Sequence, residues 1–188
     1  MNVSDTIHTA PAAQPLSLAE AKEQLRLDVS TTAEDDLLND LIAAAADMIE
    51  GMTWRALITQ TRNLKFDRFP SEIVIGRGPV SSIEQITYVD TAGVTQTLAS
   101  AAYQADLNST PARICPAYGY TWPATRPQTL QAVEVRYIAG YGASGSAVPQ
   151  RLRNAMKVAV HDWYENRMGE GDVSDVVRHL AASYRIPV

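Results

Sequence analysis

Two short patterns in the chain contain residues that could do chemistry, and the first is a glycine-rich loop. Gly140–Gly145 has the sequence G-Y-G-A-S-G, which matches the G-x-G-x-x-G pattern of dinucleotide-binding folds. A strand-like run precedes it, and Pro149 suits the first position of a helix after it. However, no second strand follows that helix, and Asp162, the acidic residue near the required distance, lies inside it. The pattern therefore favours a flexible strand-to-helix connection over a cofactor site.

The second pattern is the pair His161-Asp162, which could act as a general base with an orienting carboxylate. At helical spacing His161 points away from the apolar stripe of its helix and lies beside Lys157 and Glu165. This is the arrangement of a solvated helix face with ordinary ion pairs. The other two histidines lie near the two ends of the sequence, so no histidine ligand set can be recognised.

Metal sites are also not favoured. Glu34, Asp35 and Asp36 are consecutive, so on a helix they spread over about 200° and cannot all face one ion. Their charges instead suit the positive end of the helix dipole. Cys115 is the one cysteine, which allows no internal disulfide and no cysteine-based metal site. The sequence thus predicts a protein that is not an enzyme, with no catalytic residue, no cofactor and no metal.

Charge and hydropathy exclude further classes. The 188 residues carry a net charge of −5, and residues 1–58 hold ten acidic and three basic side chains, a net of −7. This opposes phosphate contact and disfavours a helix-turn-helix in the N-terminal helices. No apolar run approaches the roughly 18 residues of a membrane span, and the polar N-terminus does not resemble a signal peptide.

Hydrophobic periodicity predicts an α+β fold with a helical core of about four helices. Ser17 and Glu20 form a capping box for a helix over 17–27. The helix predicted over 34–51 has a wide apolar face, and a further helix over 149–167 has an apolar stripe. That wide face comprises Leu37, Leu38, Leu41, Ile42, Ala44, Ala45, Met48, Ile49 and Met52. Residues 60–139 alternate in short runs and are predicted to form an inserted, mostly antiparallel β region.

Two segments flank this connector domain of residues 16–168. Residues 1–15 are polar, contain two prolines and are expected to form a flexible tail. Residues 172–188 are expected to form a separate amphipathic segment after a break at Gly169–Gly171. Within the β region, Tyr118, Tyr120 and Trp122 lie in a proline-rich loop. These aromatic residues either contact another protein or fold back over the sheet, and base stacking is a third, weaker alternative.

The order and spacing of several segments are informative as a whole. They are Leu16–Lys22 with Leu25, Asp36–Ile42 with the alanines after it, Arg55–Thr61, Ile86–Asp90 with Gly93, Pro111–Ile114, Trp122-Pro123, Ala139–Gly142, Val148-Pro149 and Trp163–Arg167. Over about residues 16–168 the chain resembles the head–tail connector (adaptor) proteins of long-tailed phages and of phage-derived gene transfer agents.

The resemblance implies a structural subunit in the neck of a virion or virus-like particle, present in the host cytoplasm during assembly and not in a membrane. It implies a ring of about twelve subunits that docks on the portal protein. The ring would bridge the portal to a stopper or other neck protein and let DNA pass without sequence-specific binding. On this view Tyr118, Tyr120 and Trp122 are candidate contacts to other subunits or neck proteins.

The predicted portal-docking element is the C-terminal segment. Its residues are Val173, Val176, Val177, Arg178, Leu180, Tyr184 and Arg185. The main alternative for this segment is packing against the protein's own core. The alternative for the whole chain is a small-ligand-binding enzyme, a hydrolase or nucleotide-dependent protein, that uses Gly140–Gly145 and His161.

Overall fold

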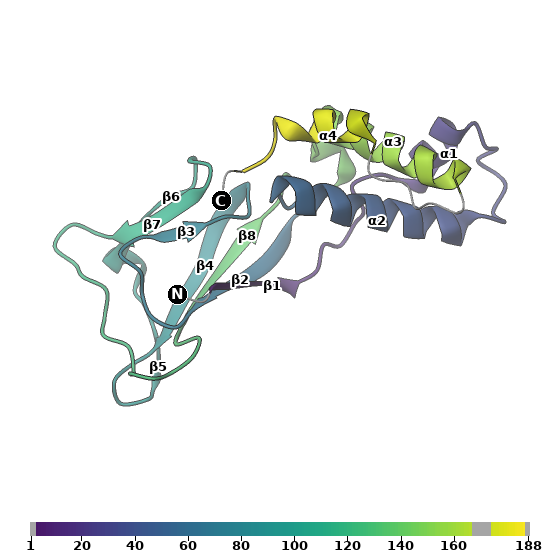
Figure 1. The fold of residues 1–188 in the computed structure, drawn as a ribbon. Coiled ribbons are helices and arrows are strands. Elements are labelled where there is room, and N and C mark those ends of the chain that lie inside the picture. The colour runs from purple at the N-terminus through teal and green to yellow at the C-terminus, as the bar shows by residue number, and fades with distance from the viewer. Residues whose placement is uncertain (1–2, 167–173, 187–188) are drawn as a thin grey trace. The chain divides into compact units, whose positions relative to one another are not determined.

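The computed structural model describes residues 3–166 and 174–186, which fall into two compact units (Figure 1). We call residues 11–58 and 141–186 the helical unit, and residues 3–10 and 59–140 the β unit. Helices and mostly antiparallel strands are thus both present, which confirms the predicted α+β class. Among the described residues, no helix combines the length and apolar character needed to cross a bilayer.

The helical unit contains α1 (Leu18–Leu25), α2 (Asp35–Thr53), α3 (Gln150–Glu165) and α4 (Asp175–Ala182). The capping box at α1 is present, because the Ser17 hydroxyl accepts from the Glu20 amide while the Glu20 carboxylate accepts from the Ser17 amide. Arg153 of α3 also binds the Glu20 carboxylate, so one acidic side chain caps α1 and ties it to α3. Each predicted helix is found, with bounds that differ by a few residues at the ends.

The core of the helical unit follows the periodicity of α2. Leu38, Ile42, Ala45 and Ile49 are fully buried, at the spacing of one helix face. Burying each of the larger apolar side chains contributes about 1.5–3 kcal/mol. The face is narrower than the sequence predicts, because Leu37 is 41% exposed. α1, α3 and α4 therefore cover less of α2 than its apolar residues alone suggest.

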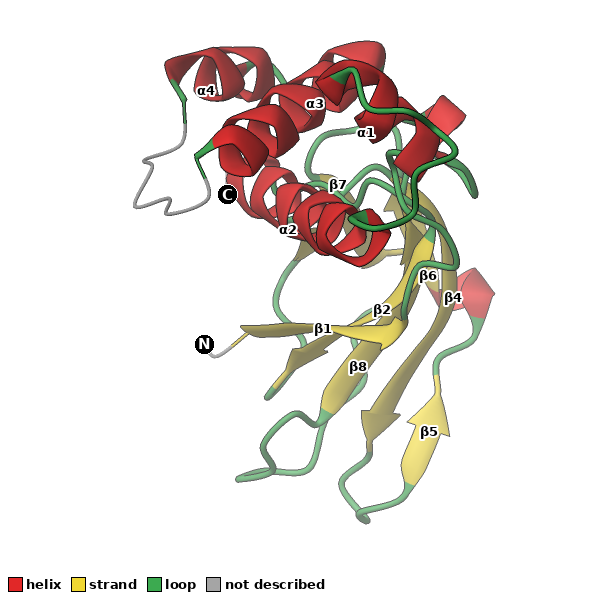
Figure 2. Cartoon of the chain, turned by 90° about the vertical axis from the view of Figure 1, so that its right-hand side faces the viewer, coloured by secondary structure: helices red, strands yellow, loops and turns green. Residues whose placement is uncertain are grey.

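The β unit contains a five-stranded antiparallel sheet with the strand order β1-β2-β8-β4-β5 (Figure 2). Its strands are β1 (Val3–Thr9), β2 (Gln60–Phe66), β4 (Val80–Val89), β5 (Thr95–Thr97) and β8 (Val133–Ala139). A smaller sheet has the order β3-β7-β6, formed by β3 (Ile73–Ile75), β7 (Ala112–Pro116) and β6 (Tyr103–Asp106). In the central strands β2 and β8, buried and half-buried residues alternate, as expected for strands with one covered face.

The N-terminal residues differ from the sequence prediction of a flexible tail over 1–15. Residues 3–9 form β1, which pairs with β2 so that Val3 lies opposite Phe66. Asp5 anchors the strand, because its carboxylate accepts from Arg62 Nε and from the Tyr137 hydroxyl, both at 2.9 Å. The backbone ladder and this polar contact hold a segment whose side chains are mostly exposed. Hydrophobic periodicity carries no signal for such a strand.

Candidate functional site

The glycine loop predicted as a strand-to-helix connection packs against the protein itself. A Cβ atom on Gly145 would lie 2.5 Å from the backbone oxygen of Pro15, and a Cβ on Gly142 would lie 2.5 Å from Cβ of Ala147. These two glycines therefore permit close approach of neighbouring chain segments. This explains the pattern without a phosphate, and a larger residue at Gly145 would displace backbone.

His161 lies about three turns along α3 from that loop, so the two candidate catalytic features are not brought together. Its Nδ1 lies 3.9 Å from Asp162 Oδ1, and both side chains are more than 40% exposed. This is the arrangement expected of a solvated helix face. Among residues 3–166 and 174–186, no group of three or more His, Cys, Asp or Glu side chains is arranged to hold a metal.

The predicted docking segment forms α4, whose stripe has two different environments. Val177 and Ala181 are buried in the helical core, with Leu180 and Tyr184 packed against it, whereas Val176 is 55% exposed. Arg178 and Arg185 are also exposed, and Arg178 pairs with Asp175 at 3.6 Å. Val173 and the Gly169–Gly171 break lie outside the described residues. The docking role stays a prediction, and the exposed side of α4 is the surface that remains for it.

The chain after α4 is held by residues that the sequence interpretation did not single out. Arg55 Nε donates to the backbone oxygen of Tyr184 at 2.5 Å, and the Ile186 amide donates to Thr53 at 3.0 Å. The Arg55 guanidinium also lies 5.8 Å from the ring centre of Tyr184 and 6.0 Å from that of Tyr141. Burial raises the pKa of Tyr141, while Arg55 acts in the opposite direction. Thr53 at the end of α2 and Arg55 just after it thus hold the segment that follows α4.

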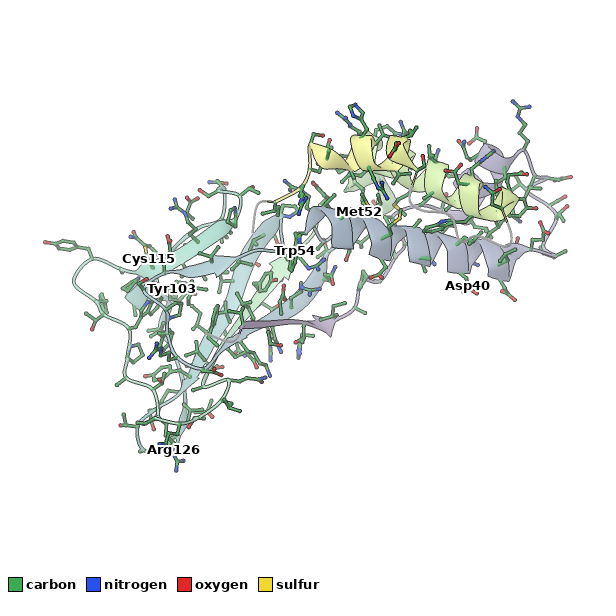
Figure 3. The ribbon with its side chains drawn as sticks, in the orientation of Figure 1. Asp40, Met52, Trp54, Tyr103, Cys115 and Arg126 are labelled. Carbon is green, nitrogen blue, oxygen red and sulfur yellow. The ribbon has the colours of Figure 1, made fainter. Side chains whose placement is uncertain are left out.

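The outer side of α2 is acidic. Asp36, Asp40 and Asp47 are exposed, and Figure 3 shows Asp40 on the side of the helix away from α3 and α4. Met52 and Trp54 mark the C-terminal end of the same helix (Figure 3), where Trp54 adopts a left-handed conformation. We call Asp36, Asp40 and Asp47 the acidic face.

The aromatic residues of the loop between β7 and β8 point in different directions. Tyr118 is fully exposed and Tyr120 is 54% exposed. Trp122, in contrast, stacks on Phe69 with ring centres 4.8 Å apart and planes 7° apart. Its Nε1 donates to the backbone oxygen of Ser71 at 3.2 Å. One aromatic residue of the three therefore folds back over the β unit, and the other two extend from it.

Two hollows lie in the β unit, and charged side chains line both. One of about 330 Å³ is lined by Glu72, Gln104, Asp106, Arg113 and Cys115, and in it Arg113 pairs with Glu72 and with Asp106. The Ser109 hydroxyl, as a hydrogen-bond donor, lowers the pKa of Asp106. Figure 3 shows Cys115 near Tyr103, on the neighbouring strand.

The second hollow, of about 620 Å³, is lined by Asp67, Arg68 and residues 125–130. The side chain of Arg126 (Figure 3) lies where a Cβ atom on Gly93 would be placed. Neither hollow combines the apolar lining and the few convergent polar groups that are typical of small-molecule sites.

The family model described as "Phage gp6-like head-tail connector protein" matches residues 15–109, which are 95 of the 188 residues. The comparison with curated proteins gave no match.

Three solved structures contain chains similar to this one over 100% of its length and 97% of theirs. The neck of an empty gene transfer agent particle, computed with C6 symmetry, matches at 28% identity and a TM-score of 0.82. The virion of a native particle matches at 28% identity and a TM-score of 0.80. The neck of a native particle, computed with C12 symmetry, matches at 27% identity and a TM-score of 0.76.

Proposed function

The chain belongs to the gp6-like family of phage head–tail connector proteins, and from this membership we propose that it forms a closed ring in the neck of a phage-like particle. It is a structural protein of the head–tail interface, as the sequence resemblance predicts. The observation that carries the proposal is the match along the full chain to proteins of gene transfer agent necks, at a TM-score of 0.82. Both compact units take part in this match, so it extends beyond the segment covered by the family.

The ring is supported by the symmetry of the similar necks, which were computed with sixfold and twelvefold symmetry. In a cyclic ring each subunit contacts its neighbours through two different surfaces, and closure follows from the rotation between them. We propose that twelve copies of this chain fill the ring, in accord with the C12 neck. Portal protein on one side, a stopper or other neck protein on the other, and DNA in the channel are the proposed partners.

Portal docking is assigned to the exposed side of α4. Val177 and Ala181 are buried in the helical core, so α4 is packed against it. Val176 and Arg178 of α4, and Arg185 after its end, are exposed. Exposed apolar and guanidinium groups fit a partner surface that offers both apolar and acidic groups. Substitution on this side tests docking without removing the core contacts of α4.

The experiment compares binding of the intact chain and of two variants to purified portal rings. The double variant Val176→Asp/Arg185→Glu should lose at least about tenfold in portal affinity while keeping its melting temperature. Arg68→Glu, an exposed arginine of the β unit, is the matched control and should bind normally. Electron microscopy of the complex should show a closed ring of this chain on the portal. Absence of any ring would contradict the proposed function, whereas normal binding by the double variant would contradict only the α4 assignment.

The acidic face of α2 supports passage of DNA without binding. Each phosphate neutralised by a basic side chain adds affinity, so a conduit is best lined by groups that repel phosphate. The alternative of an enzyme has no comparable support, since Gly142 and Gly145 permit close packing and His161 is exposed. A thermal-shift screen with nucleotides and divalent metals tests it, because any ligand specific to the folded state raises the melting temperature.

A further inference from the structure

The edge strand β1 is held in its sheet by a buried site for one carboxylate. The Asp5 carboxylate accepts from Arg62 Nε and from the Tyr137 hydroxyl, and Arg77 Nε lies 3.9 Å from it. Arg62 also donates to the side-chain oxygen of Gln60 at 3.1 Å, and these two residues are 5% and 3% exposed. Burial and the Asp5 charge raise the pKa of Tyr137, so its hydroxyl stays a donor. We call Gln60, Arg62, Arg77 and Tyr137 the aspartate socket.

Backbone pairing fixes β1 beside this socket in a single arrangement. Val3 lies opposite Phe66, and Ile7 lies opposite Arg62. Most side chains of β1 are exposed, so the strand buries little apolar surface. The strand is therefore held by its backbone ladder and by one carboxylate in the aspartate socket. Every copy of the chain carries both of these features in residues 3–9.

No hairpin connects β1 to β2. Residues 10–59 lie between the two strands, and residues 11–58 belong to the helical unit, whereas hairpin loops usually have about 2–5 residues. The connection after β1 is exposed over residues 11–14 and includes Pro11, and prolines make a linker extended and semi-rigid. It ends where the backbone of Pro15 packs closely against Gly145. The path of the chain therefore does not require that β1 and β2 come from the same subunit.

We propose that, in the assembled ring, β1 of each subunit pairs with β2 of the next and places Asp5 in the aspartate socket of that neighbour. This inference rests on the proposed function, a closed ring. Each subunit of a cyclic ring needs two different surfaces that fit one another. β1 and the aspartate socket are such a pair, and their fit is already present within one chain. Exchange of an identical element between protomers costs little, because the same contacts are made.

The aspartate socket and the edge beside it together favour a second copy of this chain as the occupant. A free phosphate or a nucleic acid would satisfy the guanidinium groups, but it would leave the backbone edge of β2 unpaired over residues 61–66. Residues 3–9 supply both a strand for that edge and a carboxylate at the matching position. In a ring of identical chains, each neighbour brings this segment.

The test introduces one cysteine into β1 and one into β2. Thr6 lies opposite Asn63, and opposed residues of antiparallel strands have Cα atoms about 4.5–5.5 Å apart, which suits a disulfide. The chain carries Thr6→Cys and Asn63→Cys, with Cys115→Ser to remove the native thiol. After oxidation of rings assembled on portal, electrophoresis without reductant should show most of the chain as covalent multimers. The free chain, with β1 paired to its own β2, should stay monomeric with an internal disulfide.

A matched control pair lies in the same sheet. Thr87 of β4 lies opposite Thr97 of β5, and a tight turn at residues 90–93 joins these two strands. Thr87→Cys with Thr97→Cys, again with Cys115→Ser, should give internal disulfides alone, both in rings and in the free chain. This control shows whether oxidation links subunits without strand exchange.

A mixing experiment isolates the contact between subunits. Chains with Thr6→Cys alone are assembled on portal together with chains that carry Asn63→Cys alone, both with Cys115→Ser. Neither chain can close an internal disulfide. Oxidation should therefore shift a large share of the mixture to covalent dimers, and assembly of either chain by itself should give none.

Internal disulfides alone in rings of the Thr6→Cys/Asn63→Cys chain would overturn the inference and leave the proposed function intact. Unlinked chains in those rings, with the control pair closed, would overturn it as well, because β1 would then not be paired with any β2. Failure of the unmodified chain to form rings on portal would overturn both the inference and the proposed function.

Discussion

Arg55, two residues after α2, holds the segment that follows α4, because its Nε donates to the backbone oxygen of Tyr184, 129 residues later in the sequence, at 2.5 Å. The guanidinium also lies 5.8 Å from the Tyr184 ring centre. Hydrogen bonds to charged groups contribute about 1.5–3 kcal/mol. We therefore expect Arg55→Ala to lower the free energy of unfolding by about 2 kcal/mol, measured by urea denaturation.

Arg55→Lys is the informative companion variant, since lysine keeps the charge but not the planar guanidinium. It should recover less than half of the lost stability. Full recovery by lysine would show that the charge alone holds the C-terminal segment.

Neighbouring valines of α4 should respond in opposite ways to truncation. Val177 is 1% exposed and lies in the helical core, whereas Val176 is 55% exposed. Val177→Ala should cost about 1–3 kcal/mol, from lost burial and the cavity left behind. Val176→Ala should change stability by less than about 0.5 kcal/mol. Thermal and chemical denaturation of the two variants measure this contrast. Equal losses of stability would argue against the packing of α4 against the core through Val177.

Asp5 should control whether β1 stays paired. Its carboxylate accepts from Arg62, whose side chain is 7% exposed, and from the buried Tyr137 hydroxyl. Asp5→Ala leaves a buried cation and a buried hydroxyl without this partner, which costs about 3–5 kcal/mol. Amide hydrogen exchange should accelerate in β1 and β2 before other strands. Unchanged protection of residues 3–9 would refute the anchoring role.

Glu20 should make stability depend on acid pH. Burial raises its pKa, but hydrogen bonds from Ser17 and Arg153 outweigh this, so the pKa lies below the usual 4.5. A carboxyl group with a lowered pKa stabilises the fold above its unfolded pKa, and this contribution is lost as pH falls through the folded value. As the pH is lowered below about 4.5, the urea midpoint of the wild type should therefore decrease more than that of Glu20→Gln. The same dependence of the urea midpoint on pH in the two proteins would contradict this.

The acidic face of α2 should prevent DNA binding. The unmodified chain is expected to show no measurable affinity for duplex DNA at about 150 mM salt. Asp40→Lys/Asp47→Lys should gain affinity that falls steeply with salt, at a slope of about 0.9 per phosphate neutralised. Fluorescence anisotropy over a salt series gives both values. Binding of duplex by the unmodified chain would refute the role of this face.

Much of the architecture can be predicted from sequence because it depends on near neighbours. Ser17 and Glu20 are three residues apart, and their reciprocal bonds identify the start of α1. The apolar spacing of α2 identifies Leu38, Ile42 and Ile49 as core residues. Helix periodicity and capping are local, so such elements can be predicted from sequence, whereas the connector family was indicated by the resemblance of particular segments in their order and spacing.

Tertiary structure alone decided the features that depend on distant partners. β1 forms because Asp5 meets Arg62 and Tyr137, which are 57 and 132 residues away. Trp122 turns inward because Phe69 offers a stacking surface, while Tyr118 has the same kind of side chain and stays exposed. Periodicity also places Val176 and Val177 on one stripe, yet only Val177 reaches the core. The sequence alone determined most of the helical and extended segments, with β1 as the exception, and its resemblance to known connectors indicated the family. Long-range packing determined which of their side chains remain available to partners, because burial depends on what the rest of the chain brings alongside.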